Sequence, residues 1–438
     1  MTTHHAPRST HLREAHAHIA MHGRELSTLQ LSACRGRAEC LEGLRAEALR
    51  LDAVDPARTR WLVANGVRVE SWDDPRWITR GELDAVVGPR CACVMSFDYH
   101  AILASTAAFR AAGITDDAPN PEGGVVVRDP RGEPTGLLLE NACRLVRDAV
   151  PPPTADERAP LVRTALADFA SHGFAEVHDL LSEPWLGETL ALLHDRGELP
   201  ARVGLFPPVE DIEEHAAAAK RWTRPGNVEL LGGKIFVDGT LNSRTAWMLE
   251  PFRNPMPAHP KGTPLMTVEE IARAIERCAA LGFGLAAHAI GDGAVRTVLD
   301  ACERTRALRA AAGVAVRIEH AEVVHPSDIP RFAELGVVVS VQPCHLLYDI
   351  EVLTRELPDR LDHVMPLRSF IDSGLVPGRT LLFGSDAPIV RPHPRDSIDA
   401  AMLRTRPAGS RIGPEGTPVA PHQNLTEDLA WACFGASS

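Results

Sequence analysis

A repeated alternation of apolar and helical segments constrains the fold of this chain more than any other feature of its sequence. Seven short segments are rich in β-branched and other apolar residues and end in polar ones, and a stretch with helical character follows each of them. They span residues 173–180, 202–209, 232–240, 282–292, 316–324, 337–345 and 381–388. Strands that are apolar throughout are typical of a parallel sheet buried on both faces.

The segments between these strands carry signals for helix boundaries. Thr267 and Glu270 have the spacing of a capping box, and Gly282 lies where a helix C-cap is expected. Thr154 and Glu157 have the same capping-box spacing ahead of the first of the seven strands. We therefore predict an α/β fold in which strands alternate with helices.

Closing such a sheet into a barrel requires an eighth strand, and the segment HLREAHAHI at 11–19 is the candidate. We predict a (β/α)8 TIM-like barrel, with strand 1 in residues 1–23 and the remainder in residues 151–438. Residues 24–150 then form a large insertion after strand 1. Their tryptophans, the turn-forming DDPRW and the Pro- and Gly-rich PNPEGGVVVRDPRGEPTG indicate an insertion or lid subdomain.

Charge and composition exclude several classes of protein. The formal net charge of −12 repels phosphate backbones and anionic lipids, so we expect no nucleic-acid or membrane partner. The nine cysteines form no Cys-x-x-Cys pair, so neither a disulfide framework nor a cysteine zinc finger is encoded. No window approaches the roughly 18 apolar residues of a membrane span, and the N-terminus has no signal-peptide core. We expect a soluble cytoplasmic protein with reduced thiols.

Six residues that can ligate a metal lie at the predicted strand ends: His16, His18, Lys234, His288, His320 and Asp386. In a parallel barrel the carboxyl ends of all strands meet at one face, so these residues converge there. Histidines two apart on a strand point the same way, which lets both bind one ion. The combination is therefore a candidate metal centre.

Each of these residues, taken alone, also has a purely structural interpretation. A His-x-His pair is often incidental in a chain with 19 histidines, His288 or His320 alone fits a hydrogen-bonded core histidine, and Asp386 alone fits a helix cap. Lys234 is harder to explain, because only three of the 46 basic residues are lysines and a lysine in an apolar strand carries a desolvation penalty. Arginine cannot replace a lysine whose amine must react with carbon dioxide to form a carbamate.

The order His-x-His, Lys, His, His, Asp resembles the amidohydrolase superfamily. The phrases GGKIFVDGTLNSRTA, AAHAIGDGAV, RIEHAEVV, VVVSVQPCH and FGSDAP are similar to its YtcJ-like branch, amidohydrolase family 3. The upstream segments FDYHAILASTAAFRAAGI and RDPRGEPTGLLLENA are similar to the DGHS-type and RD-x-x-G-x-P-T-G segments of that branch. The resemblance runs from about residue 14 to residue 435.

The resemblance implies a divalent metal centre of one or two ions, with zinc expected and iron or manganese as alternatives. His16 and His18 would bind one ion, His288 and His320 the other, and a carboxylated Lys234 would bridge them. Asp386 would shuttle the proton while a metal-activated hydroxide attacks. The implied reaction is hydrolysis of a carbon–nitrogen bond other than a peptide bond, in an amide, cyclic amide or N-formyl group.

Three further residues are candidates for contact with a small-molecule substrate: His100, Arg244 and His345. His100 and His320 are the alternative carriers of the catalytic proton. Asp238, Asp292 and Glu319 are interpreted either as groups that contact and support the ligands or as structural groups. Because the β-sandwich that usually flanks this barrel is largely absent, an apolar flank needs cover and we expect a homodimer.

Two alternatives remain open. The same superfamily contains metal-dependent lyases, decarboxylases and isomerases, so the chemistry could be non-hydrolytic. A barrel scaffold without turnover is the other alternative, and the intact ligand set argues against it.

Overall fold

The computed structural model describes residues 11–69, 72, 74–96, 101–121, 124–410, 412–413 and 415–435. The chain divides into two compact units. Unit one comprises Met1–Gly23 and Arg158–Ser438, and unit two comprises Arg24–Glu157. The sequence predicts these boundaries after residues 23 and 150.

The described strands of unit one form two sheets in which every pairing is parallel. The first sheet has the order β1-β8-β9-β10 and the second the order β11-β12-β13-β14-β15. The strands are β1 (Leu12–Ala17), β8 (Phe174–Leu180), β9 (Arg202–Phe206), β10 (Val228–Leu230), β11 (Gly232–Phe236), β12 (Gly284–Ala289), β13 (Val316–His320), β14 (Val338–Val341) and β15 (Leu381–Phe383). They lie within the eight segments that the sequence predicts as strands, apart from β10, which adds a short strand immediately before β11.

Isolated bridges connect the two sheets at both edges. Pro208, just after β9, pairs in parallel with Lys234 on β11, and Ala17 on β1 pairs in parallel with Ala387, just after β15. Neighbouring strands therefore follow one another in chain order from β8 to β15, with β1 beside both β8 and the segment after β15. Because the pairings are parallel, the carboxyl ends of these strands lie on the same side of the sheets.

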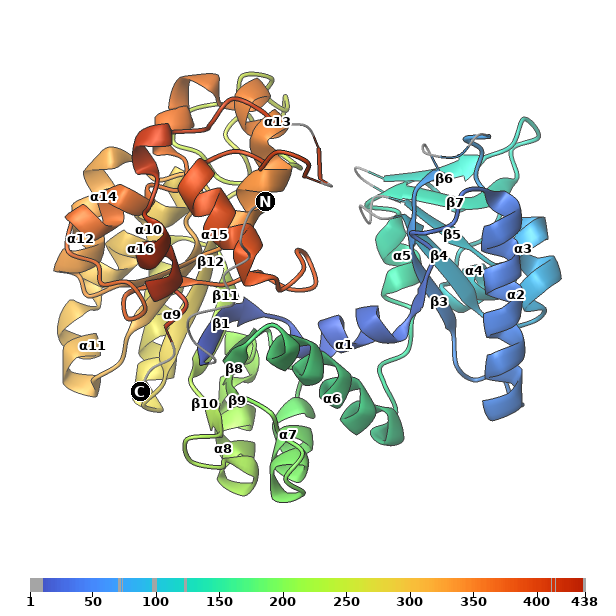
Figure 1. The fold of residues 1–438 in the computed structure, drawn as a ribbon, viewed down its shortest axis with the longest axis horizontal. Helices are drawn as coiled ribbons and strands as arrows, with labels where there is room; N and C mark the ends of the chain where they lie inside the picture. The colour runs from blue at the N-terminus through green and yellow to red at the C-terminus, as the bar shows by residue number, and fades with distance from the viewer. Residues whose placement is uncertain are drawn as a thin grey trace. The chain divides into compact units, whose positions relative to one another are not determined.

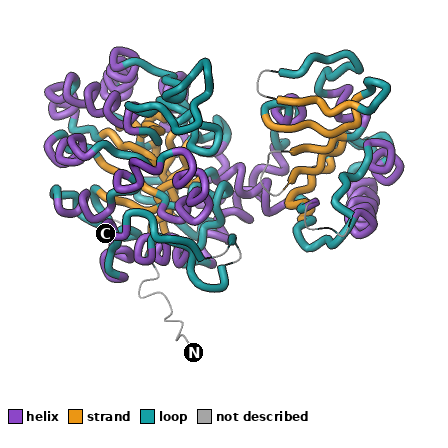
Figure 2. Tube along the Cα trace, turned by 90° about the horizontal axis from the view of Figure 1, so that it is seen from above, coloured by secondary structure: helices purple, strands orange, loops and turns teal. Residues whose placement is uncertain are grey.

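Helices surround the strands of unit one, as Figures 1 and 2 show. The helices outside residues 28–154 are α1 (Ile19–Ser27), α6 (Ala155–Ser171), α7 (Leu186–Asp195), α8 (Ile212–Trp222), α9 (Val268–Ala280), α10 (Asp292–Arg304), α11 (Arg306–Ala312), α12 (Ile329–Glu334), α13 (Leu346–Glu356), α14 (Leu367–Asp372), α15 (Pro394–Leu403) and α16 (Glu427–Ala432). The predicted capping box of Thr267 and Glu270 is present at the start of α9, and Gly282 follows that helix with a φ of +80°. Both predictions are confirmed.

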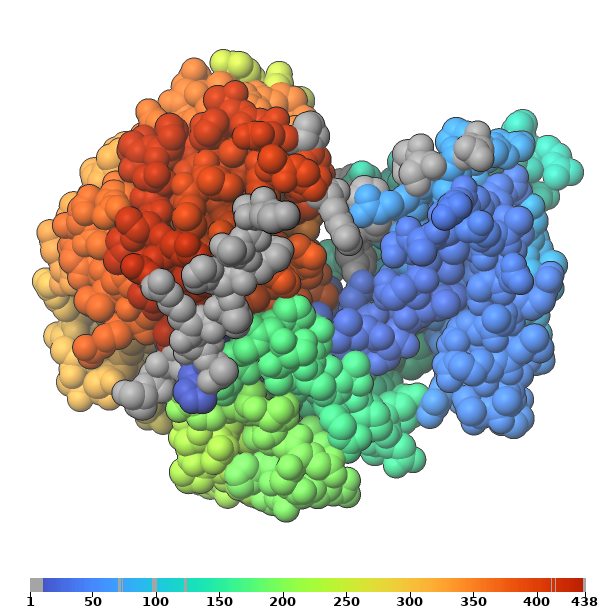
Figure 3. Space-filling view, viewed as in Figure 1, coloured from blue at the N-terminus to red at the C-terminus, as the bar shows by residue number. Residues whose placement is uncertain are grey.

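One continuous apolar core joins the strands of unit one to their helices. Val177 on β8 and Ile318 on β13 are fully buried in the same cluster as Phe169 on α6 and Trp222 on α8. The space-filling view shows the residues from α7 onward, coloured green to red, packed as one body (Figure 3). Apolar residues on both faces of the parallel strands account for this core, as the sequence pattern predicts.

Unit two contains a mixed six-stranded sheet of order β2-β3-β4-β5-β7-β6, in which β2, β3 and β4 pair in parallel and the other pairings are antiparallel. Its elements are β2 (Leu29–Gln30), α2 (Arg37–Val54), β3 (Leu62–Val67), α3 (Arg80–Val87), β4 (Ala92–Ser96), β5 (Ala101–Ala104), α4 (Thr106–Ala111), β6 (Gly124–Arg128), β7 (Pro134–Glu140) and α5 (Cys143–Arg147). Val94 packs in a core with α2 and α3, whereas Cys93 packs in another with α4 and α5. Strand alternation thus serves two separate cores.

Among the described residues, no helix combines the length and the apolar character that crossing a bilayer requires.

Candidate active site

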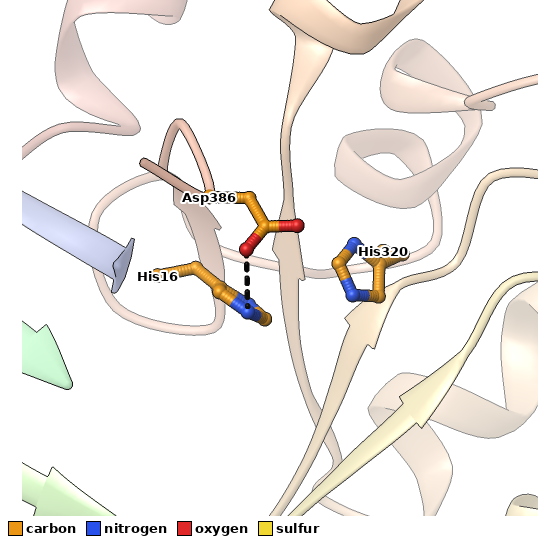
Figure 4. A group of neighbouring side chains, drawn as sticks. All are labelled: His16, His320 and Asp386. Atoms are coloured by element: carbon orange, nitrogen blue, oxygen red, sulfur yellow. Dashed lines mark ion pairs between the residues drawn. The ribbon is translucent and has the colours of Figure 1, made fainter. Parts of the chain in front are cut away.

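Three side chains from distant parts of the sequence meet at the carboxyl ends of the strands of unit one. His16 lies on β1, His320 ends β13, and Asp386 lies in the turn after β15 (Figure 4). All three are buried, and one potential ligand atom from each lies within 4.8 Å of the others. His16 Nε2 is 3.4 Å from Asp386 Oδ1, and the ring centroids of His16 and His320 are 4.8 Å apart. We call these three residues the open cluster.

Two members of the open cluster have a left-handed backbone conformation. The φ angles of His320 and Asp386 are +74° and +63°, a region that residues other than glycine adopt at a cost of about 1 kcal/mol or more. On a regular strand Glu319 and His320 point to opposite faces. The left-handed turn breaks this alternation, and both residues contact His16. Strain at two neighbouring positions is typical of a functional site.

Glu319 determines which nitrogen of His16 faces the open cluster. Its Oε2 lies 2.7 Å from His16 Nδ1, and both side chains are buried. A carboxylate only accepts hydrogen bonds, so Nδ1 carries the proton and Nε2 presents its lone pair toward Asp386. This contact agrees with the first of the two sequence interpretations of Glu319, a group that supports a candidate ligand rather than a purely structural one.

Arg317 joins Glu319 to a larger group of buried polar side chains. Its Nε donates to Glu319 Oε1 at 2.5 Å, and its Nη1 donates to His178 Nδ1 at 2.8 Å. His178 Nε2 donates in turn to Glu176 Oε1 at 2.9 Å, and Arg13 Nε donates to the same oxygen at 2.9 Å. We call Arg13, Glu176, His178, Arg317 and Glu319 the paired cluster.

A buried glutamate ties the end of β15 to β1. Glu14 Oε1 accepts the backbone N–H of His16 at 3.1 Å and that of Ser385 at 2.8 Å, and Glu14 Oε2 accepts the Ser385 hydroxyl at 2.9 Å. The strands approach so closely that a Cβ on Gly384 would lie 2.6 Å from Glu14 Oε1 and 2.7 Å from the His16 nitrogen. Glycine at this position therefore allows Asp386 to reach His16.

The other three predicted ligands border the open cluster. His18 Nε2 is 2.9 Å from Asp386 Oδ1, and the His288 ring centroid lies 4.5 Å from that of His320. His288 Nε2 donates to the Gly239 carbonyl at 3.1 Å, so in the neutral ring Nδ1 carries no proton and can act as a ligand. Lys234 is buried, and its Nζ lies 5.1 Å from the centroid of the Phe236 ring. Among the described residues, this ammonium has no hydrogen-bond or ion-pair partner.

Burial sets the protonation of these groups. It lowers the pKa of His16 to about 4 and that of His288 to about 3, so both imidazoles are neutral at neutral pH. Burial also lowers the pKa of the Lys234 amine to about 8. Burial opposes ionisation of Asp386, but attraction to the protonated forms of His16 and His18 holds the pKa of that carboxyl well below its ordinary value. The site thus combines neutral nitrogen donors with an anionic oxygen donor.

The polar atoms of the open cluster are better arranged to bind a cation than to hydrogen-bond one another. His320 Nδ1 is buried and has no hydrogen-bond partner within the described parts of the chain, whereas the buried Asp386 Oδ1 is approached by His18 Nε2 at 2.9 Å and by His16 Nε2 at 3.4 Å. The lone pair of His16 Nε2 also faces the Asp386 carboxylate without a proton between them. Two acceptors in this arrangement repel each other, and a divalent cation between them removes the repulsion.

The three predicted substrate-binding residues have different outcomes. His345 lies close to the open cluster, with its ring stacked at 6.0 Å on that of His320, its Nδ1 3.2 Å from Glu322 Oε1 and its Nε2 3.3 Å from the Ser385 carbonyl. Burial disfavours the protonated form of His345, but the hydrogen bond and charge of Glu322 favour that form more strongly and raise the pKa of His345 to about 9. Arg244 donates to the Asn254 carbonyl, and none of its described contacts is with a predicted ligand. His100 lies outside the described residues.

The remaining predicted structural groups hold the loops around the site. Asp238 accepts the backbone N–H groups of Trp247, Ile290 and Gly291 at 2.8–3.0 Å, and Asp292 accepts that of Leu249 at 2.8 Å.

Sequence reasoning did not single out Glu14, Arg317 or Glu322. Their shared signal is a charged residue inside an apolar strand or at its end, two positions from a candidate ligand or from another buried acid. His320, Glu322 and His345 form a second group of potential ligand atoms within 4.8 Å of one another. A buried charge in such a place requires a partner, and here the partner is a residue of the site.

Comparisons with known proteins identify the family. The profile of the amidohydrolase family matches residues 12–433. The chain is 30% identical over 406 residues to the amidohydrolase-family protein YtcJ of Bacillus subtilis (strain 168), covering 89% of this chain and 72% of that protein. It is 27% identical over 366 residues to the N-substituted formamide deformylase of Arthrobacter pascens, covering 80% of this chain and 64% of that enzyme.

A solved structure of an uncharacterized metal-dependent hydrolase from Pyrococcus furiosus shares the fold. Its TM-score is 0.75 at 24% identity, and the match covers 96% of this chain and 79% of the other. The sequence matches place the chain among the hydrolases of this superfamily. The family profile over nearly the whole chain and the identity to YtcJ show that the chain belongs to the amidohydrolase family, as its motifs predict.

Proposed function

We propose that this protein is a metal-dependent amidohydrolase that hydrolyses a carbon–nitrogen bond other than a peptide bond. The observation that carries the proposal is the convergence of His16, His320 and Asp386 within 4.8 Å, with the buried His320 Nδ1 unpaired among the described residues. The parallel strands of unit one, adjacent in chain order and bridged at both edges, support a (β/α)8 barrel that presents these residues at its carboxyl face.

The proposed site holds one or two divalent cations, with zinc favoured by the imidazole-rich donors. His16, His18 and Asp386 form one side of the site, and His288 and His320 form the other. When bound, such ions lower the pKa of water and polarise a substrate carbonyl. The protein contributes fixed donors, because Glu319 orients His16 and the Gly239 carbonyl orients His288.

Asp386 is the proposed proton shuttle. Its carboxyl is ionised at neutral pH, because its pKa lies well below the ordinary value, so it is available to accept a proton. It takes the proton from the attacking water and returns it to the leaving nitrogen, so that amine and acid are the products. An amide, cyclic amide or N-formyl group fits this sequence of proton transfers.

Lys234 is proposed to be carboxylated. A pKa of about 8 leaves part of the amine neutral at neutral pH, and a neutral amine can attack carbon dioxide. The N–C bond forms, one proton leaves to solvent, and the resulting carbamate is an anionic ligand. This reaction would replace a buried cation that lacks a described counterion with an anion beside the proposed metal site.

Metal analysis tests the proposed centre. We expect the purified protein to hold one or two zinc ions and to release amine from a panel of N-formyl and N-acetyl amides. The double variant His16→Ala, His18→Ala should lose metal and activity, whereas His194→Ala on the surface of unit one should keep both. Equal metal content in wild type and double variant would remove the two histidines from the site.

Chemical rescue tests the carbamate. Lys234→Ala should lose activity and regain part of it with short-chain carboxylates that occupy the vacated position. Lys234→Arg with full activity would exclude a carbamate, because a guanidinium stays protonated.

A further inference from the structure

A cavity of about 420 Å³ opens beside the proposed metal site, at the carboxyl ends of three strands. Leu181 follows β8, Pro208 follows β9, and Phe236 ends β11, and all three line the cavity. Ile235 on β11 and Leu265 and Met266, which precede α9, complete its apolar wall. The volume lies in the range of pockets that hold small organic ligands.

The cavity borders the proposed site at Phe236. One side of this ring faces Lys234, whose Nζ is 5.1 Å from its centroid, and its centroid lies 5.2 Å from that of His288. Lys234 itself also borders the cavity. A group bound in the cavity therefore lies next to two of the proposed ligands.

Three large apolar side chains around the cavity are exposed. Leu181 and Phe236 are each 41% exposed, and Leu265 is 54% exposed. Leu181 also has a φ of +101°, a conformation that leucine rarely adopts, and its N–H is held by the Phe206 carbonyl at 2.8 Å. Exposure of apolar residues together with a strained backbone indicates a binding surface.

The rim of the cavity is acidic. Glu210 and Glu270 both line it and are exposed. Glu270 stays ionised, because its hydrogen bonds from Thr267 lower the pKa of its carboxyl. Two carboxylates at the rim repel an anionic group, and the apolar wall favours an apolar group as the occupant of the cavity.

We infer that this cavity binds an uncharged apolar substituent of the substrate, of the size of a phenyl ring or a short alkyl chain, while the scissile bond lies at the open cluster. The inference rests on the proposed function and specifies its substrate class. The substrate is accordingly an amide or formamide with a neutral apolar substituent, and not one with a carboxylate in that position.

Binding of hydroxamates to the zinc-loaded protein tests the inference, because a hydroxamate ligates zinc and carries a variable tail. We expect phenylacetohydroxamate to bind at least tenfold more tightly than acetohydroxamate in calorimetric titrations. The monohydroxamate of succinate, with its anionic tail, should bind more weakly than the phenyl compound. Leu265→Asp and Leu181→Gly should remove most of the phenyl preference and leave acetohydroxamate binding unchanged, since glycine tolerates the φ of +101°.

Leu192→Asp on α7 is the matched control, because this leucine is 42% exposed and does not line the cavity. It should keep the phenyl preference. Equal affinity for the phenyl and methyl compounds in the wild type would overturn the inference and leave the proposed function intact. A protein that retains no zinc and binds neither compound would overturn both.

Discussion

The open cluster and the paired cluster share a contact within unit one but differ in how completely their polar atoms are satisfied. In the paired cluster every buried side-chain nitrogen and oxygen has a described partner, and its residues lie in regular strands. In the open cluster His320 Nδ1 has none, and both His320 and Asp386 have left-handed backbones. The contact between His16 and Glu319 joins the two.

This difference separates structural from functional polar groups. Buried charged side chains that hydrogen-bond one another stabilise one arrangement of the strands, and they have no free donor or acceptor atom with which to bind a ligand. Buried atoms without partners are costly unless something binds them. Changes to the open cluster, to the paired cluster, to the contact between them and to pH therefore show whether activity and stability separate in the same way.

The largest effect is expected from Asp386→Asn in the open cluster. The amide cannot accept and return the proton, so turnover should fall about 10²–10⁴-fold, the usual contribution of a positioned acid or base. Metal content should stay largely unchanged, because the amide oxygen still faces His16. Amine release and metal analysis check this, with Asp195→Asn at the surface as the control. Near-normal turnover would assign the proton transfer to another group.

Glu176→Gln should weaken the interactions within the paired cluster and leave the open cluster unchanged. Glu176 partners Arg13, His178 and Arg202 at 2.7–2.9 Å, and neutralising it leaves the arginines without that negative partner. The free energy of unfolding should fall by about 3 kcal/mol. Metal affinity should not change.

Urea unfolding measures this loss, and Glu188→Gln, which removes an exposed pair with Arg221, should cost less than about 1 kcal/mol. A matching loss of metal affinity in Glu176→Gln would show that the two clusters are not separable.

Glu319→Gln changes the contact between the clusters. A glutamine cannot accept from His16 and Arg317 at once with both of its terminal atoms, so the tautomer and orientation of His16 are no longer determined. Metal affinity should fall about 10–100-fold, the usual effect of losing such a hydrogen bond to a metal-binding histidine. Competition with a chelator measures the affinity, and Glu176→Gln is the control. Unchanged affinity would mean that Glu319 is structural only.

The smallest effect concerns pH, because burial lowers the pKa of His16 and of His178 to about 4. Between the ordinary pKa of 6.5 and 4, the unfolded chain binds protons that the folded chain does not, so stability falls as pH falls through this window. Each histidine contributes a slope of up to about 1.4 kcal/mol per pH unit. Urea unfolding of the metal-free protein at pH 7, 6 and 5 should show a smaller slope for His178→Gln. Equal slopes would contradict the burial argument.

Residue pattern alone determines much of this protein. The apolar strand segments, the capping box at Thr267 and the C-cap at Gly282 depend on local preferences, and the structure contains each of them. The motif phrases predict the family, which the comparisons confirm. Identifying the six candidate ligands required only that parallel strands end on one side.

Only the tertiary structure decided how those residues meet. The left-handed conformations of His320 and Asp386 depend on contacts with strands hundreds of residues away in the sequence, and local preference disfavours both. The partnership of Glu14 with Ser385, of Glu319 with His16 and the exclusion of any Cβ at Gly384 are likewise long-range. The sequence pattern indicates which charged side chains are buried. A buried charge needs a hydrogen-bond or ion-pair partner, but which residue becomes that partner depends on how the chain packs.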